Sequence, residues 1–239
     1  MIILQIYTTR VCYLNQAIFK GVVDIMIIEI EGASCAGKTT HSEFIKKILE
    51  SYVGDIFMAK EPSESVVGKY VRKINNSIED PLVSACLFLA NRMETVREYS
   101  ESRMSNLLSD RFCGSTIVYQ FDELKLSKHQ STISSTISKV KDIILSDGMR
   151  PDLSIILDAP IDCLIKRSIK RMKEIGRGIT GPEKKESFKH YNQKIIDKYI
   201  EYYLNQDYCW DKLLINAEGS IKDVERRIED AIGSFFVKE

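Results

Sequence analysis

The chain has 239 residues, of which 44% are hydrophobic, so it can bury one large core or two small ones. Its 34 basic and 34 acidic residues balance, which argues against a general nucleic-acid binder and against a polybasic protein of membrane surfaces. The six cysteines form no CxxC pair or zinc-binding spacing, and no apolar run approaches the ~18 residues of a membrane span, so we expect a soluble cytoplasmic α/β protein with reduced thiols.

The first 25 residues are expected to be an extension of unknown role that precedes one domain, residues 26–239. Residues 1–23 contain Arg10 and Lys20, no acidic residue and several apolar side chains, but little serine or arginine for an organelle-targeting segment. A start just after this segment would place the first strand at the beginning of the domain. A dispensable extension is therefore favoured, and an added edge strand or helix is the alternative.

Short apolar strands alternate with helices along the rest of the chain. The apolar runs predict strands at 25–30, 55–59, 106–109, 152–158 and 212–215. Helical spacing predicts helices at 38–51, 65–75 and 81–103, a basic helix up to about 177, and a closing helix over 221–232. The polar stretch 125–138 is expected to be a loop and a helix start. This alternation is typical of a parallel sheet covered by helices on both faces.

Residues 32–39, GASCAGKT, match the pattern G-x-x-x-x-G-K-[ST] at each fixed position, between a predicted strand and a predicted helix. The glycines permit a turn whose backbone N–H groups face phosphate oxygens, and the helix adds its positive N-terminal end. Lys38 can reach the β- and γ-phosphates, and the Thr39 hydroxyl can ligate Mg²⁺. Cys35 lacks an evident His partner, so a small tolerated residue is favoured over a catalytic thiol. The predicted ATP-binding residues are Gly32, Ala33, Ser34, Cys35, Ala36, Gly37, Lys38, Thr39 and Thr40.

Three further motifs follow in order: FLANR at 88–92, SDRFCGSTIVYQ at 109–120 and PDLSIILDAP at 151–160. Together with the phosphate loop and the Lys-Glu-Pro at 60–62, they resemble the thymidylate (dTMP) kinase family, from about residue 26 to the C-terminus. The resemblance implies a three-layer α/β/α P-loop kinase fold with a central parallel sheet and a short mobile lid. It also implies Mg²⁺-dependent transfer of the γ-phosphoryl group of ATP to dTMP, and a homodimer, for which the 81–103 helix is the candidate interface.

Arg111 follows a carboxylate at a strand end, where open α/β sheets bind ligands, and its planar fork suits a monophosphate. The resemblance implies that Phe88 stacks on thymine and that Arg92 binds the carbonyl edge of the base. From spacing alone, a core phenylalanine beside a surface arginine would be the simpler interpretation. The resemblance also assigns Thr116 to the pyrimidine and Tyr119 to the 2′ side of the sugar.

Asp110 resembles the carboxylate that orients Mg²⁺ near the transferring phosphate, and a purely structural Asp–Arg pair is its alternative. Basic residues recur on the helix that follows the fourth strand, and nucleotide kinases carry a lid at this place, here about residues 166–185. A lid arginine would neutralise charge in phosphoryl transfer, and Arg171 or Arg177 is the candidate. Ala217, after the last strand, resembles the loop that lies against adenine.

The chain also departs from the family pattern. Ser34 and Cys35 stand where the family usually has Asp and Gly, which puts recognition of the 3′-hydroxyl in question. The first alternative is a deoxynucleoside kinase that phosphorylates a 5′-hydroxyl with a carboxylate base, for which Glu61, also a candidate substrate contact, is available. The second alternative is a nucleotide-binding protein without phosphotransfer. A small-molecule nucleotide is expected as partner, with neither nucleic acid nor membrane.

Overall fold

Five parallel strands form the centre of the protein, described by a computed structural model over residues 25–74, 77, 80–121, 130–174 and 186–237. They hydrogen-bond in the order β2-β3-β1-β4-β5. The strands are β1 (Ile27–Glu31), β2 (Ile56–Lys60), β3 (Asn106–Asp110), β4 (Leu153–Asp158) and β5 (Asp211–Asn216). Because all neighbours run parallel, the carboxyl ends of the strands meet at one edge, which is where ligands bind in such sheets.

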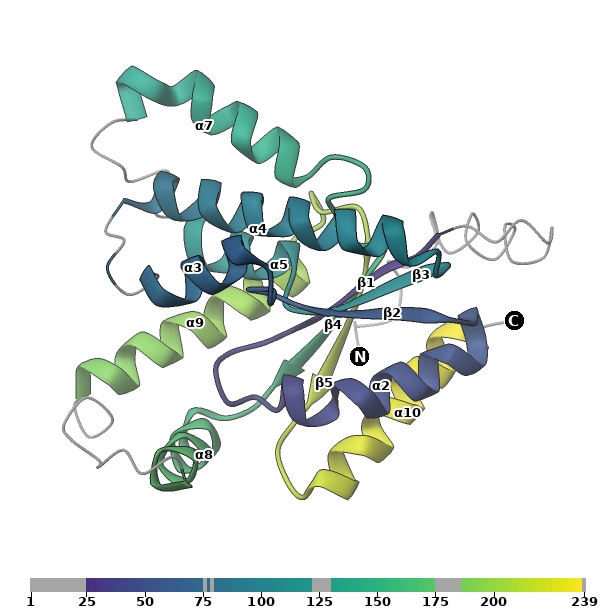
Figure 1. The fold of residues 1–239 in the computed structure, drawn as a ribbon. Coiled ribbons are helices and arrows are strands. Elements are labelled where there is room, and N and C mark those ends of the chain that lie inside the picture. Colours follow the sequence, from purple (N-terminus) through teal and green to yellow (C-terminus); the bar gives the residue numbers. More distant parts are fainter. Residues whose placement is uncertain (1–24, 75–76, 78–79, 122–129, 175–185, 238–239) are drawn as a thin grey trace.

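Helices cover both faces of the sheet, giving three layers (Figure 1). The longer helices are α2 (Lys38–Val53), α3 (Val66–Ile74), α4 (Pro81–Ser102), α7 (Gln130–Ile144), α8 (Ile161–Glu174), α9 (Glu186–Leu204) and α10 (Ile221–Phe236). Helices α2 and α10 pack together on one face, while α4 and α9 lie on the other. A single helical turn, α5 (Cys113–Thr116), follows β3 and continues into a π-helical turn, Ile117–Phe121.

The predicted strands and helices are confirmed, with strand ends that shift by at most two residues and a closing helix that continues four residues further, to Phe236. Helix α9 is the exception, because no element was expected between the lid and the last strand. Its buried positions include Ile195, Tyr199 and Tyr202, which recur at helical spacing. Residues 1–24, the predicted turn at 176–182 and part of the 125–138 stretch lie outside the described residues.

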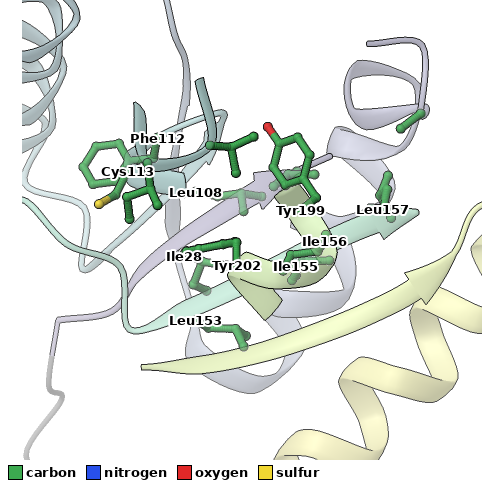
Figure 2. Close-up of a cluster of buried hydrophobic side chains, with 14 of the residues drawn as sticks. Ile28, Leu108, Phe112, Cys113, Leu153, Ile155, Ile156, Leu157, Tyr199 and Tyr202 are labelled. Carbon is green, nitrogen blue, oxygen red and sulfur yellow. The ribbon is translucent and has the colours of Figure 1, made fainter. Parts of the chain in front are cut away.

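The core on the α9 side is mixed rather than purely apolar. Figure 2 shows Tyr199 and Tyr202 of α9 among buried side chains of β4 and of the segment after β3. Glu29 and Glu31, two residues apart on β1, point to the same face and are both fully buried.

The described cysteines are all free thiols. Among the described helices, none has the length and apolar character that a membrane crossing requires.

Gly114 of α5 lies directly above the two β1 glutamates. A Cβ atom there would lie 2.9 Å from Glu29 Oε1, 2.9 Å from Glu31 Cγ and 3.1 Å from a ring carbon of Tyr202. Such distances force a shift in a fully buried region. The close approach of α5 to β1 therefore requires glycine at this position.

We predict that Gly114→Ala lowers the free energy of unfolding by about 1–3 kcal/mol through overpacking. Gly233→Ala in α10 is the matched control, because its added Cβ meets only the Tyr52 hydroxyl at 3.4 Å, an ordinary contact. That variant should be neutral or more stable by up to roughly 1 kcal/mol, since alanine favours a helix interior. Urea unfolding of both variants measures the difference. Equal stability of the two variants would contradict the close packing of α5 on β1.

Candidate active site

The phosphate-binding loop connects β1 to α2 and depends on backbone conformations that favour glycine. Gly32 and Gly37 have φ values of 138° and 106°, and Cys35 has φ 64°. A Cβ on Gly32 would lie 2.3 Å from the carbonyl oxygen of Leu157, so the loop packs directly against the end of β4. Helix α2 begins at Lys38, which places its N-terminal N–H groups at the predicted phosphate site.

Lys38 is buried within this loop. Its ammonium group donates to the carbonyl oxygens of Gly32 at 2.7 Å and Ala33 at 2.8 Å. Burial, and then the nearby positive charge of Arg111, lower the pKa of Lys38 to about 7. The amine is therefore held across the loop by neutral carbonyls, which leaves its charge available to an incoming phosphate.

Thr39 and Asp110, the two predicted metal ligands, lie side by side. The Thr39 hydroxyl donates to Asp110 Oδ2 at 2.5 Å, and Lys60 Nζ lies 3.2 Å from the same hydroxyl and 3.5 Å from the same carboxylate oxygen. A hydroxyl, one carboxylate and phosphate oxygens form the donor set that Mg²⁺ accepts, since it keeps several waters and needs few protein ligands. The described residues hold no cluster of three or more metal-ligating His, Cys, Asp or Glu side chains.

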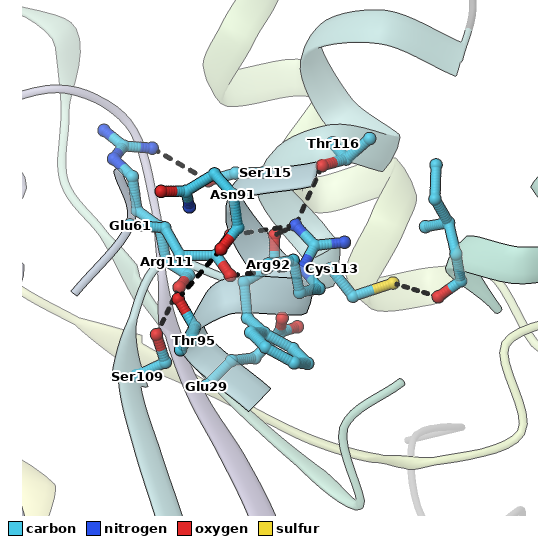
Figure 3. A network of polar contacts seen from close by, with 12 residues as sticks. Glu29, Glu61, Asn91, Arg92, Thr95, Ser109, Arg111, Cys113, Ser115 and Thr116 are labelled. Atoms are coloured by element: carbon cyan, nitrogen blue, oxygen red, sulfur yellow. Dashed lines mark hydrogen bonds and ion pairs between the residues drawn. The ribbon is translucent and has the colours of Figure 1, made fainter. Parts of the chain in front are cut away.

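Arg92 and Glu61 form a buried ion pair between α4 and the end of β2 (Figure 3). Arg92 Nη2 lies 3.0 Å from Glu61 Oε2, and Nε donates to Oε1 at 3.3 Å. The same Nη2 also donates to the Phe112 carbonyl at 2.6 Å and the Thr116 hydroxyl at 2.9 Å. Nη1 is buried and has no hydrogen-bond partner among the described residues. Burial raises the pKa of Glu61, and the charge and hydrogen bonds of Arg92 lower it. The first effect is larger, so the resulting pKa is about 7.

Arg111 follows β3 with a left-handed backbone, φ 74°. Its Nη1 donates to the Ser115 hydroxyl at 2.9 Å and lies 3.5 Å from the Tyr199 hydroxyl. The guanidinium also lies over the ring of Tyr119, 5.8 Å from its centroid. Burial alone would lower the pKa of Arg111, but Tyr199, Tyr119 and nearby carboxylates raise it above its usual value.

The structure thus brings together most of the predicted acceptor residues. Thr116 contacts Arg92, Tyr119 lies beneath Arg111, and Phe88 lies one helical turn before Arg92 on α4. Arg171 is exposed on α8, and Arg177 lies outside the described residues. Their assignment to the lid stays a prediction.

Arg167 is a residue that the sequence analysis passed over as one charge in a basic helix. Its Nη2 donates to the Ala217 carbonyl at 2.7 Å, and its Nη1 lies 3.4 Å and 3.3 Å from the carbonyls of Cys35 and Ala36. It therefore ties the phosphate loop to the predicted adenine loop. Its position on the inner face of α8 was the available signal, because the exposed lysines lie elsewhere on that helix.

Thymidylate kinases are found both among the sequence relatives and among the solved structures that this chain resembles. The thymidylate kinase family model matches residues 30–228. A probable thymidylate kinase of Methanocaldococcus jannaschii is 30% identical over 209 residues, covering 86% of this chain and 95% of the relative. A thymidylate kinase of Prochlorococcus marinus is 31% identical over 159 residues, covering 60% of this chain and 71% of the relative. The crystal structure of thymidylate kinase from Ehrlichia chaffeensis has the same fold, with a TM-score of 0.55 at 20% identity, covering 87% of this chain and 98% of the other.

We predict that binding of ATP at pH 8 takes up protons through Lys38. The amine, with a pKa of about 7, is mostly neutral in the free protein at that pH, and adjacent phosphates restore its charge. Calorimetry in two buffers of different ionisation enthalpy should show uptake of roughly half to one proton per nucleotide. Lys38→Arg is the control, since arginine stays charged and should show almost none. Equal uptake by both proteins would assign the proton to another group.

Proposed function

The chain belongs to the thymidylate kinase family, and from that premise we propose that it transfers the γ-phosphoryl group of ATP to dTMP, giving dTDP and ADP. The observation that carries the proposal is the position of Arg111. It lies at the carboxyl end of β3, immediately after Asp110 and close enough to Lys38 to lower the pKa of that amine. An acceptor monophosphate bound by Arg111 would therefore face a donor phosphate held by the loop.

The guanidinium of Arg111 supports a phosphate ligand. Its Nη1 donates to two neutral hydroxyls, those of Ser115 and Tyr199, and Tyr119 is a further side-chain hydrogen-bond partner of Arg111. None of the ion pairs between described residues includes Arg111. A planar edge with its charge uncompensated by a direct carboxylate is suited to two oxygens of a phosphate.

The unpaired nitrogen of Arg92 supports recognition of a base. Removal of a guanidinium N–H from water costs free energy unless the group finds an acceptor. Glu61, Phe112 and Thr116 hold the rest of the side chain, so its orientation is fixed before ligand binds. We propose that a pyrimidine carbonyl satisfies Nη1 and that Phe88, four residues earlier on α4, stacks on the ring.

A deoxynucleoside kinase, the first alternative, is not favoured by these contacts. It requires a carboxylate free to accept the proton of a 5′-hydroxyl. Both oxygens of Glu61 already face Arg92, and the side chain is buried. A phosphate acceptor needs no such base, because it is already an anionic nucleophile.

Thr39 and Asp110 would hold Mg²⁺ together with ATP, and the ion would supply positive charge at the β- and γ-phosphates. The protein residues align the two anions, with Lys38 on the donor side and Arg111 on the acceptor side. Arg171 or Arg177 would add charge from the lid.

We also propose that the protein forms a homodimer through α4, on which Val83 and Met93 are exposed. We propose further that residues 1–25 are dispensable for activity.

The first test is ADP release from ATP and Mg²⁺ with dTMP, dUMP and thymidine at equal concentration. We expect strong turnover with dTMP and little with thymidine, because thymidine has no phosphate for Arg111. Comparison of dTMP with dUMP measures the selectivity for the 5-methyl group. Preferential turnover of thymidine would instead support the deoxynucleoside kinase, and no turnover with any acceptor would support a binding protein.

Replacement of Arg111 by alanine tests the acceptor site directly. We expect kcat/KM for dTMP to fall by about 100-fold or more, the loss of charge-assisted hydrogen bonds to phosphate. Arg226→Ala on α10 is the control, because Arg226 is exposed on a helix that packs against α2 and β5 rather than at the acceptor site or on α4. A change of less than about threefold in the Arg111 variant would remove the central support for a monophosphate acceptor.

A further inference from the structure

Two tyrosine–glutamate pairs connect α9 to β1. The Tyr199 hydroxyl donates to Glu31 Oε2 at 2.9 Å, and the Tyr202 hydroxyl donates to Glu29 Oε1 at 2.6 Å. All four side chains are buried, and the tyrosines are one helical turn apart. The pairs are chemically equivalent, but they differ in what else they contact.

Glu31 is satisfied without a direct cation. Its Oε1 accepts from the backbone N–H groups of Phe112 at 2.9 Å and Ser115 at 2.8 Å. Its Oε2 accepts from the Ser115 hydroxyl at 2.8 Å and from Tyr199. These donors fill the lone-pair directions of a carboxylate, so Glu31 forms no direct ion pair with a described arginine or lysine.

The two hydroxyls connect Glu31 to Arg111. A hydroxyl has a single hydrogen, and both Ser115 and Tyr199 direct theirs to Glu31, so that oxygen lone pairs face Arg111 Nη1. The hydroxyls are also 3.3 Å apart, and the Tyr199 ring contacts Tyr119 edge-on with a centroid distance of 6.3 Å. One edge of the guanidinium is thereby fixed, as Figure 3 shows for Arg111 and Ser115.

We propose that Glu31 and Tyr199 are positioning residues, which act through the Ser115 and Tyr199 hydroxyls to aim Arg111 at the acceptor phosphate. This inference rests on the proposed role of Arg111. A direct Glu31–Arg111 ion pair would compete with the phosphate for the guanidinium, whereas neutral hydroxyls orient the side chain and leave its other edge to the ligand. Glu31 also directly precedes Gly32, so one residue fixes the acceptor arginine relative to the donor loop.

The Tyr202–Glu29 pair provides an internal control. Glu29 accepts from the backbone N–H of Gly114 and the Ser154 hydroxyl, and the Tyr202 hydroxyl accepts from the Trp210 indole N–H and contacts Ser154. Within the described chain, none of the hydrogen bonds of this pair reaches Arg111. Loss of the Tyr202 hydroxyl should therefore affect stability without affecting the acceptor site.

The test compares Tyr199→Phe with Tyr202→Phe in the full-length protein. For each we would measure KM and kcat for dTMP at saturating ATP, KM for ATP at saturating dTMP, and the melting temperature. Tyr199→Phe should raise KM for dTMP by about three- to tenfold, the range expected for loss of one buried hydrogen bond, while KM for ATP stays within about twofold. Both variants should lower the melting temperature to a similar extent, since each loses one buried tyrosine hydroxyl. Tyr202→Phe should leave KM for dTMP unchanged.

Ser115→Ala is the second variant, because it removes the nearer hydroxyl from Arg111 without replacing a residue of α9. It should raise KM for dTMP at least as much as Tyr199→Phe, and it decides the question if Tyr199→Phe does not fold. If the wild-type protein turns over dTMP but both variants keep its KM, the positioning role is wrong and the proposed function stands. If the wild-type protein does not turn over dTMP at all, the proposed function fails, and this inference fails with it.

Discussion

The carboxylate of Glu31 accepts hydrogen bonds from Phe112, Ser115 and Tyr199, and through them it holds β1, the turn after β3 and α9 together. A buried carboxylate is costly unless its oxygens find donors, so these contacts constrain where each element can lie. The turn after β3 must bring two backbone N–H groups to the glutamate, and Gly114 permits that approach. The position of Arg111 at the start of this turn follows from the same constraint.

The protein satisfies its two site glutamates in opposite ways. Glu61 pairs directly with Arg92, and the Nη1 of that arginine has no partner among the described residues. Glu31 instead meets neutral donors, and the arginine beyond them keeps its charge. The difference suits two kinds of ligand group, because a base carbonyl needs a single oriented donor whereas a phosphate needs uncompensated positive charge.

The sequence alone was sufficient to predict the features that depend on residues close together in the chain. The phosphate loop, the strands and the residues at the strand ends could be predicted, because each involves neighbours in the chain and a known periodicity. The partners of those residues could not be predicted in this way. Glu31 and Tyr199 are 168 positions apart, and Glu61 and Arg92 are 31 apart, so only the folded sheet brings them together. Helix α9 was missed although its buried positions recur at helical spacing, since polar and charged residues separate them.

The backbone explains one of the departures in the phosphate loop. Cys35 adopts φ 64°, a conformation in which glycine avoids the steric cost of a Cβ atom. A glycine at this position, which the family usually has, is therefore a conformational preference rather than a requirement for contact with the nucleotide. Ser34 is different, because its exposed side chain is short and carries no charge where the family usually has Asp. The contacts that orient Arg111 and Arg92 do not involve either residue. A change at Ser34 would therefore test recognition of the sugar separately from the contacts proposed for Arg111 and Arg92.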